Sequence, residues 1–127
     1  MPARIEGNKL YNEYSAALAS GGGPDDVVDP SDGETRLSKA ARGNDVPTVK
    51  LLLAHRANPN KAQKHGLTAL HWAAIRGDDA AVQALLAAGA AVNATTKGGG
   101  TPLYFADVYN RHSTVGILRS AGGTKYR

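Results

Sequence analysis

The stretch from Gly66 to Asp79, GLTALHWAAIRGDD, contains the signals for one short helix and the start of a second. Thr68 is a residue type that caps helix N-termini, and Gly77 is the type that ends helices in a left-handed conformation. Between them, apolar residues recur at the three- and four-residue spacing of one helix face: Leu70, Ala73 and Ala74. The stretch therefore predicts a helix that begins after Thr68 and stops at Gly77.

A second helix is predicted directly after the first. Asp78 or Asp79 can cap its N-terminus, and Gly89 stops it. Its apolar face is formed by Val82, Leu85 and Leu86. The residues from 90 to 100, AAVNATTKGGG, are too small and polar to continue a helix and predict an extended turn. The unit is thus a helix hairpin followed by a loop.

The same pattern recurs along the chain with a period of 33 residues. The matching sets are Thr35, Thr68 and Thr101; Leu37, Leu70 and Leu103; Ala40, Ala73 and Ala106; Val49, Val82 and Val115; and Leu52, Leu85 and Leu118. A fixed period of this length is typical of stacked repeats, in which each unit buries its apolar face against its neighbours. We expect three such units.

The flanking units start and stop their helices with different residues. In the first unit, Asp45 is the expected cap of the second helix and Pro47 lies in its first turn, where a missing N–H costs little. The helix-ending glycine of this unit comes one position early, at Gly43. In the third unit, Thr101 and Pro102 again predict a cap followed by proline at the first helical position.

These residues carry a family resemblance. Residues 66–94, GLTALHWAAIRGDDAAVQALLAAGAAVNA, resemble the ankyrin repeat, with its segments G-x-T-P-L-H-x-A-A, G-x-x-x-x-V, L-L-x-x-G-A and V-N-A. The flanking units depart from it, with Ser38 and Tyr104 in place of the histidine. The resemblance covers about residues 23 to 124. It implies an all-α solenoid of stacked helix-turn-helix units of 33 residues joined by extended β-turn loops.

The expected division of the chain is a leader at residues 1–30 and repeats at 31–63, 64–96 and 97–127, the last with a C-terminal cap and tail. Within the leader, residues at helical spacing predict one helix face: Leu10, Tyr11, Tyr14, Ala17 and Leu18. Two interpretations stay open for the leader. It is either a capping helix with a degenerate half-repeat or a flexible arm.

Composition excludes several classes of protein. The chain has no cysteine, which removes disulfides, thiolate nucleophiles and cysteine-based zinc sites. The N-terminus has no apolar core of signal-peptide type, so we expect a soluble intracellular protein in the cytoplasm, with the nucleus as an alternative.

Charge is unevenly distributed along the chain. Two basic and five acidic side chains give residues 1–30 a formal charge of −3, and 13 basic and 6 acidic side chains give the rest +7. A basic body favours anionic partners.

No catalytic site is expected. A catalytic interpretation would begin with His55, His65, His71 or His112, but none has a partner at a recognisable spacing. In the ankyrin pattern the position of His71 is structural. The glycine runs at 21–24 and 98–100 lack the lysine and hydroxyl that follow a phosphate-binding loop, so both predict turns. We therefore expect no enzyme, no cofactor and no metal.

The resemblance also implies where a partner would bind. Partners of ankyrin repeats usually contact the loop tips and the exposed side of the first helices. Carried over position by position, the candidate residues are Ser31, Asp32, Glu34, Arg42, Lys64, His65, Leu67, Trp72, Ile75, Arg76, Lys97, Phe105, Val108 and Tyr109. Their mixture of aromatic, aliphatic and basic side chains is typical of protein interfaces. For Trp72 and Phe105, packing between neighbouring first helices is the equal alternative.

The sequence therefore predicts a non-catalytic, monomeric module that binds another protein or peptide, with an acidic partner as one option and no role for a membrane. One alternative is a structural segment or spacer of a larger ankyrin-repeat protein. Against this alternative, Arg111, Arg119 and the tail at residues 124–127 are polar enough to close the array. The second alternative is non-specific binding of nucleic acid, although the basic residues are scattered over all three repeats.

Overall fold

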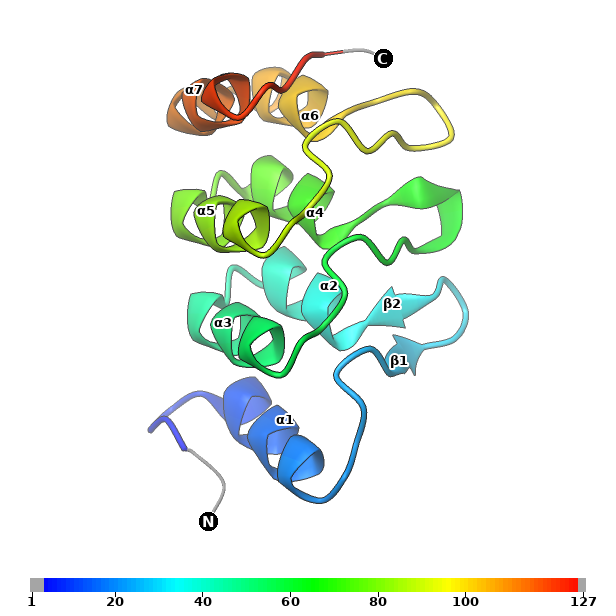
Figure 1. Ribbon diagram of the computed structural model, residues 1–127, viewed down its shortest axis with the longest axis vertical. Coiled ribbons are helices and arrows are strands. Elements are labelled where there is room, and N and C mark those ends of the chain that lie inside the picture. The colour runs from blue at the N-terminus through cyan, green and yellow to red at the C-terminus, as the bar shows by residue number, and fades with distance from the viewer. Residues whose placement is uncertain (1–3, 126–127) are drawn as a thin grey trace.

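The helices pair and stack along one axis in the computed structural model, which describes residues 4–125 (Figure 1). The pairs are α2 (Arg36–Arg42) with α3 (Val46–Ala54), α4 (Ala69–Arg76) with α5 (Asp79–Ala87), and α6 (Pro102–Val108) with α7 (His112–Ser120). Between pairs, the chain runs through loops that project to one side of the stack, and the second loop carries a 3-10 turn at Lys64–Gly66. The predicted solenoid of helix-turn-helix units is confirmed.

Each first helix begins at a threonine, as the sequence predicts. The hydroxyls of Thr35, Thr68 and Thr101 each accept a hydrogen bond from the backbone N–H three residues later. Asp45 and Asp78 cap the second helices of their repeats in the same way. These side chains satisfy backbone donors that a helix start leaves without partners. The predicted helix starts in these units are therefore confirmed.

Each first helix is followed by a residue in the left-handed conformation. The left-handed residues at the ends of the first helices are Asn44 (φ 59°), Gly77 (φ 69°) and Asn110 (φ 59°), which are 33 positions apart. Gly43 has φ −85° and does not take this conformation. Helix α2 ends at Arg42 with Gly43 as its C-cap, one position earlier in its repeat than α4 ends, as the sequence predicts. Asn44 follows as the left-handed residue, because asparagine is one of the few residues that tolerate this region.

Small and branched apolar side chains fill the space between the two rows of helices. First helices pack in the order α2, α4, α6, and second helices in the order α3, α5, α7. The fully buried members of this core include Ala40, Ala41, Val49, Leu52, Leu70, Ala73, Ala74, Val82, Leu85, Ala106 and Leu118. Alanines let the first helices approach closely, and each buried leucine contributes about 1.5 to 3 kcal/mol.

The leader folds onto the first repeat. Its helix α1 (Lys9–Ala19) packs against α3, which extends the row of second helices by one (Figure 1). Asn8 caps α1 and donates its side-chain N–H to Asp45 Oδ1 at 2.9 Å. Strand β1 (Val27–Asp29) pairs in antiparallel fashion with β2 (Glu34–Thr35), across the division predicted at residue 30. Residues 1–3 of the leader lie outside the described residues.

Tyr14 of α1 lies under Arg36 of α2. The guanidinium carbon is 5.3 Å from the centre of the tyrosine ring, a cation–π geometry. Burial raises the pKa of Tyr14 to about 12. Arg36 also lies 3.7 Å from Asp26, so the leader holds this arginine from two directions.

Backbone hydrogen bonds connect neighbouring loop tips. The N–H of Lys64 donates to the carbonyl of Asp32 at 2.6 Å, and the N–H of Lys97 donates to the carbonyl of His65 at 2.9 Å. Each tip therefore positions the next one, and the loops form a continuous surface beside the first helices.

Two asparagines fix the segments that lead into the loops. Asn60 Oδ1 accepts from the N–H of Ala91 at 2.7 Å, and Asn93 Oδ1 accepts from the N–H of Thr124 at 2.8 Å. The two bridges are 33 residues apart, and each joins one repeat to the next segment of the stack. The spacing between repeats is held by polar contacts as well as by the core.

Candidate functional site

The candidate residues lie on one face of the stack. We call it the inner face: the exposed side of α2, α4 and α6 together with the loop tips at residues 30–34, 63–67 and 96–100. In Figure 1 these loops extend away from the second helices.

A groove opens on the inner face between the second and third repeats. Its volume is about 390 Å³. Its lining residues are His65, Leu67, Trp72, Ile75, Thr96, Lys97, Gly98, Phe105 and Tyr109. Seven of these are candidates chosen from the sequence, brought together from two loops and two helices. We call this feature the repeat 2–3 groove.

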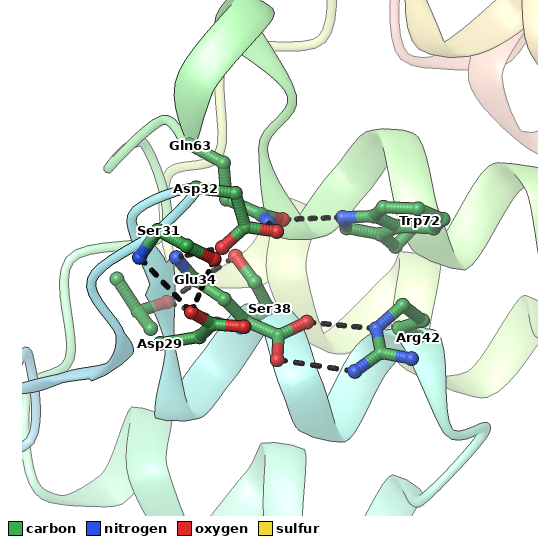
Figure 2. Close-up of polar contacts among 9 residues, drawn as sticks. Asp29, Ser31, Asp32, Glu34, Ser38, Arg42, Gln63 and Trp72 are labelled. Carbon is green, nitrogen blue, oxygen red and sulfur yellow. Dashed lines mark hydrogen bonds and ion pairs between the residues drawn. The ribbon is translucent and has the colours of Figure 1, made fainter.

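Trp72 is held in place by a hydrogen-bonded relay that crosses two loops (Figure 2). Its indole N–H donates to Gln63 Oε1 at 2.5 Å, and the Gln63 amide N–H donates to Asp32 Oδ2 at 3.2 Å. Gln63 is only 7% exposed, so its amide has few alternatives. Trp72 is half-buried against the core and still lines the groove. It therefore both packs and presents surface.

Phe105 forms the opposite wall and is fixed by ring contacts. Its ring meets His71 edge to face at a centroid distance of 5.7 Å, and Tyr104 at 5.4 Å. A Cβ at Gly100 would lie 3.0 Å from the Phe105 ring, so Phe105 packs closely against this glycine. Like Trp72, Phe105 packs on one side and lines the groove on the other.

His71 has the structural role expected of it. It is fully buried, its Nδ1 accepts from the backbone N–H of Thr68 at 3.0 Å, and its Nε2 donates to the carbonyl of Gly100 at 3.2 Å. Burial lowers the pKa of His71 below its ordinary 6.5. The imidazole is therefore a neutral link between α4 and the third loop, with both nitrogens engaged.

The acidic side chains of the first loop are satisfied within the protein. Glu34 is buried and accepts from Arg42 at 2.7 and 3.0 Å, a bidentate pair that raises the pKa of Arg42 (Figure 2). Asp29 accepts from the hydroxyl of Ser31 at 2.6 Å, and this hydrogen bond holds the pKa of Asp29 below its usual range. Asp32 is occupied by the relay. These carboxylates have internal partners.

The basic side chains near the groove, unlike these carboxylates, have no ion-pair partner within residues 4–125. Lys64, Arg76 and Lys97 are exposed, and none of them forms an ion pair within residues 4–125. No acidic residue of this range lines the groove. The charge that the inner face offers to a partner around the groove is therefore positive.

Several candidates lie apart from the groove. Ser31, Asp32, Glu34 and Arg42 belong to the first repeat, and Lys64 and Arg76 are chain neighbours of groove residues without lining it. Val108 is 53% exposed but also does not line the groove.

Sequence reasoning did not single out Gln63 or Thr96. Gln63 orients Trp72, and Thr96 lines the wall. They are 33 positions apart, at the first residue of their loop tips, so the repeat itself was the signal that could have found them.

Within residues 4–125, the structure does not support a metal site or a membrane-spanning helix. Within residues 4–125, no group of three or more His, Cys, Asp or Glu side chains could hold a metal ion. No helix in the same range is long and apolar enough to cross a membrane. The glycine run at 98–100 lies in a turn between helices, as expected. A hollow of about 400 Å³ beside α1 is lined mainly by polar and charged residues such as Asn8, Asn12 and Glu13.

Stacked helix pairs with loops projecting to one side define a helical-repeat solenoid. The family model described as ankyrin repeats, in three copies, matches residues 11–96 and 37–126, and the chain belongs to this family. Ankyrin-repeat domains are generally protein–protein interaction modules and are typically non-catalytic. Comparison with curated proteins finds no match.

Proposed function

We propose that this protein is a non-catalytic interaction module that binds a partner protein or peptide through its inner face. The observation that carries the proposal is the repeat 2–3 groove. Half-buried Ile75 and 51%-exposed Tyr109 line it together with Trp72 and Phe105, where a surface without a partner would favour polar residues. Aromatic anchors in a recess with basic side chains around them are the usual centre of a protein interface.

The proposal is tested by affinity capture from a native cell extract, quantified by mass spectrometry. Wild-type protein is compared with Ile75→Ala, Arg76→Ala and Tyr109→Ala. Gln83→Ala, an exposed change on α5, is the control on the opposite side of the stack. Partners should be retained by the control and reduced by the three variants, with far-UV circular dichroism unchanged. Equal capture by all five proteins would refute the inner face as the binding surface.

Two other functions predict different results in the same experiment. A structural spacer in a larger protein would capture no partner that depends on the inner face. A nucleic-acid binder would be retained on any polyanion, with affinity that falls steeply with salt. A monomeric state and a cytoplasmic location, both expected from the sequence, stay predictions.

A further inference from the structure

We infer that the repeat 2–3 groove receives one apolar side chain of an extended, acidic partner segment, whose carboxylates lie over Lys64, Arg76 and Lys97. This rests on the proposed function and specifies the chemistry of the partner. Three observations support it: the groove has fixed walls, its size suits a side chain, and the charges around it are unpaired.

The walls of the groove are organised before any partner arrives. Trp72 is oriented by Gln63, and Gln63 by Asp32, through hydrogen bonds that cross two loops (Figure 2). Phe105 is held by His71 and Tyr104. A recess whose aromatic walls are already ordered loses little conformational entropy on binding, which favours affinity.

The size of the groove accommodates one large apolar side chain. Its volume of about 390 Å³ is near the small end of the range of roughly 300–1,000 Å³ found for small-molecule pockets. Tyr109 is 51% exposed at its margin and would become buried when an anchor enters. The groove therefore fits one large apolar residue while the rest of the segment passes over the inner face.

Charge complementarity identifies the sequence around the anchor. Lys64, Arg76 and Lys97 have no ion-pair partner within residues 4–125, whereas Glu34 is occupied by Arg42. The inner face can therefore offer free positive charge near the groove but little free negative charge. Carboxylates on both sides of an apolar anchor would gain from this arrangement, and basic residues would be repelled.

The same charges could attract nucleic acid, but the aromatic residues argue against it. Single-stranded nucleic acid is bound by successive rings on which successive bases stack. Here Trp72 and Phe105 face a single recess, and the indole N–H that could bond a base edge is already donated to Gln63. A protein segment is the better fit, and an oligonucleotide becomes a comparison in the test.

The test selects displayed random short peptides on the full chain. Enriched sequences are then synthesised without tryptophan and titrated while the emission of Trp72 is followed, since it is the single tryptophan of the chain. We expect enriched peptides to carry Asp or Glu on both sides of one Phe, Leu, Ile or Met. Their binding should change the Trp72 emission and weaken as salt rises.

Matched variants localise the binding. Tyr109→Ala should reduce affinity by about tenfold or more, as for a central interface residue. Lys97→Ala should weaken the acidic peptides severalfold, while Lys50→Ala, the same loss of charge on α3, should leave affinity unchanged. This pair separates a contact at the groove from the effect of net charge.

The results that would overturn the groove inference differ from those that would overturn the proposed function. Enriched peptides with basic or uncharged flanks, or with affinity that Tyr109→Ala does not alter, would overturn the inference, as would a selection that enriches nothing. Peptides that Tyr109→Ala does not affect can still lose affinity with Lys39→Ala, a variant on α2 of the inner face. In that case the protein binds through the inner face but not through the groove, and the proposed function stands. If an oligonucleotide of random sequence displaces the peptides and binds more tightly, the partner is nucleic acid and both proposals fail.

Discussion

Trp72 and Gln63 are joined by a hydrogen bond of 2.5 Å that ties one aromatic wall of the groove to the loop before it. Gln63 is in turn bound to Asp32 of the preceding loop. The orientation of one groove wall is thus set by residues of two different loops. A substitution at Asp32, which does not line the groove, can therefore alter the shape of the groove.

Gln63→Ala should loosen Trp72 without unfolding the protein. The indole N–H would lose its acceptor, at a cost of about 1 kcal/mol, and the ring would become more mobile. We expect a shift of the Trp72 emission maximum to longer wavelength and stronger quenching by acrylamide. Gln83→Ala, an exposed glutamine on α5, should change neither property. An unchanged emission and quenching profile in Gln63→Ala would show that packing alone orients the ring.

Protonation of His71 should destabilise the fold at mildly acid pH. Because burial lowers the pKa of His71 in the folded state below 6.5, the unfolded chain takes up the proton first as pH falls. The free energy of unfolding should therefore decrease as pH falls from about 7.5 to about 5. Urea denaturation at both pH values measures the change.

His71→Gln is the variant that isolates this effect. Glutamine can still bond the backbone at this helix position but cannot titrate, and it loses the link to the carbonyl of Gly100. We expect a loss of about 1 to 3 kcal/mol near neutral pH and a weaker dependence on pH. His65→Asn, at an exposed left-handed position, should keep the dependence of the wild type. The histidine would not be responsible if His71→Gln retained the full slope.

Arg56 occupies a strained backbone position that the later repeats fill with glycine. Its φ is 66°, and the residues 33 and 66 positions later are Gly89 and Gly122, with φ of 94° and 93°. Arg56→Gly should raise the free energy of unfolding by about 0.5 to 1 kcal/mol, since relief of the strain exceeds the entropy cost of glycine. Arg56→Ala is the control, because it removes the side chain but keeps the strain. Thermal or urea denaturation measures the free energy of unfolding of both variants. Equal values for the alanine and glycine variants would contradict this explanation.

The sequence predicts the helices well because their signals are local. A threonine cap, an apolar residue two positions later and a left-handed stop all act within a few residues, and the period of 33 repeats them. The position of the left-handed residue does not follow from the glycines alone, because this position accepts asparagine as well as glycine. Asn44, Gly77 and Asn110 share a backbone conformation rather than a residue type.

The groove could be predicted only in part. Its residues were found because the repeat places their positions on one face, but their association depends on packing between repeats. The relay was out of reach, since Asp32, Gln63 and Trp72 occupy different positions in their repeats and meet only when the loops stack. The charge pattern was also hidden. Net charge does not reveal that Arg42 is paired with Glu34 while Lys97 has no ion pair within residues 4–125.

Asn8 should determine how firmly α1 is attached. It caps α1 by accepting from the N–H of Tyr11 at 2.9 Å and donates to Asp45 at the start of α3. Asn8→Ala removes both bonds and should destabilise α1 by about 1 to 2 kcal/mol. In hydrogen exchange, amides of α1 should exchange faster in the variant while those of α4 and α5 stay protected. Rapid exchange at Tyr11, Tyr14 and Leu18 in the wild type would favour the flexible arm over a capping helix.

Tyr14→Phe should leave the stability unchanged or raise it. The Tyr14 hydroxyl is buried and finds no hydrogen-bond partner within residues 4–125, so the folded state gains nothing from it and loses its hydration. Phenylalanine keeps the ring under Arg36 and the contacts with the core. Tyr14→Ala, by contrast, should cost several kcal/mol, as a large-to-small change does in a core. Urea denaturation of both variants measures the two effects, and a clear loss of stability in Tyr14→Phe would reveal a partner for the hydroxyl.

The same residue should be visible in a pH titration of the wild type followed by absorbance. Because burial raises the pKa of Tyr14 to about 12, one phenol should resist ionisation until about pH 12. Tyr14→Phe should remove that step from the titration.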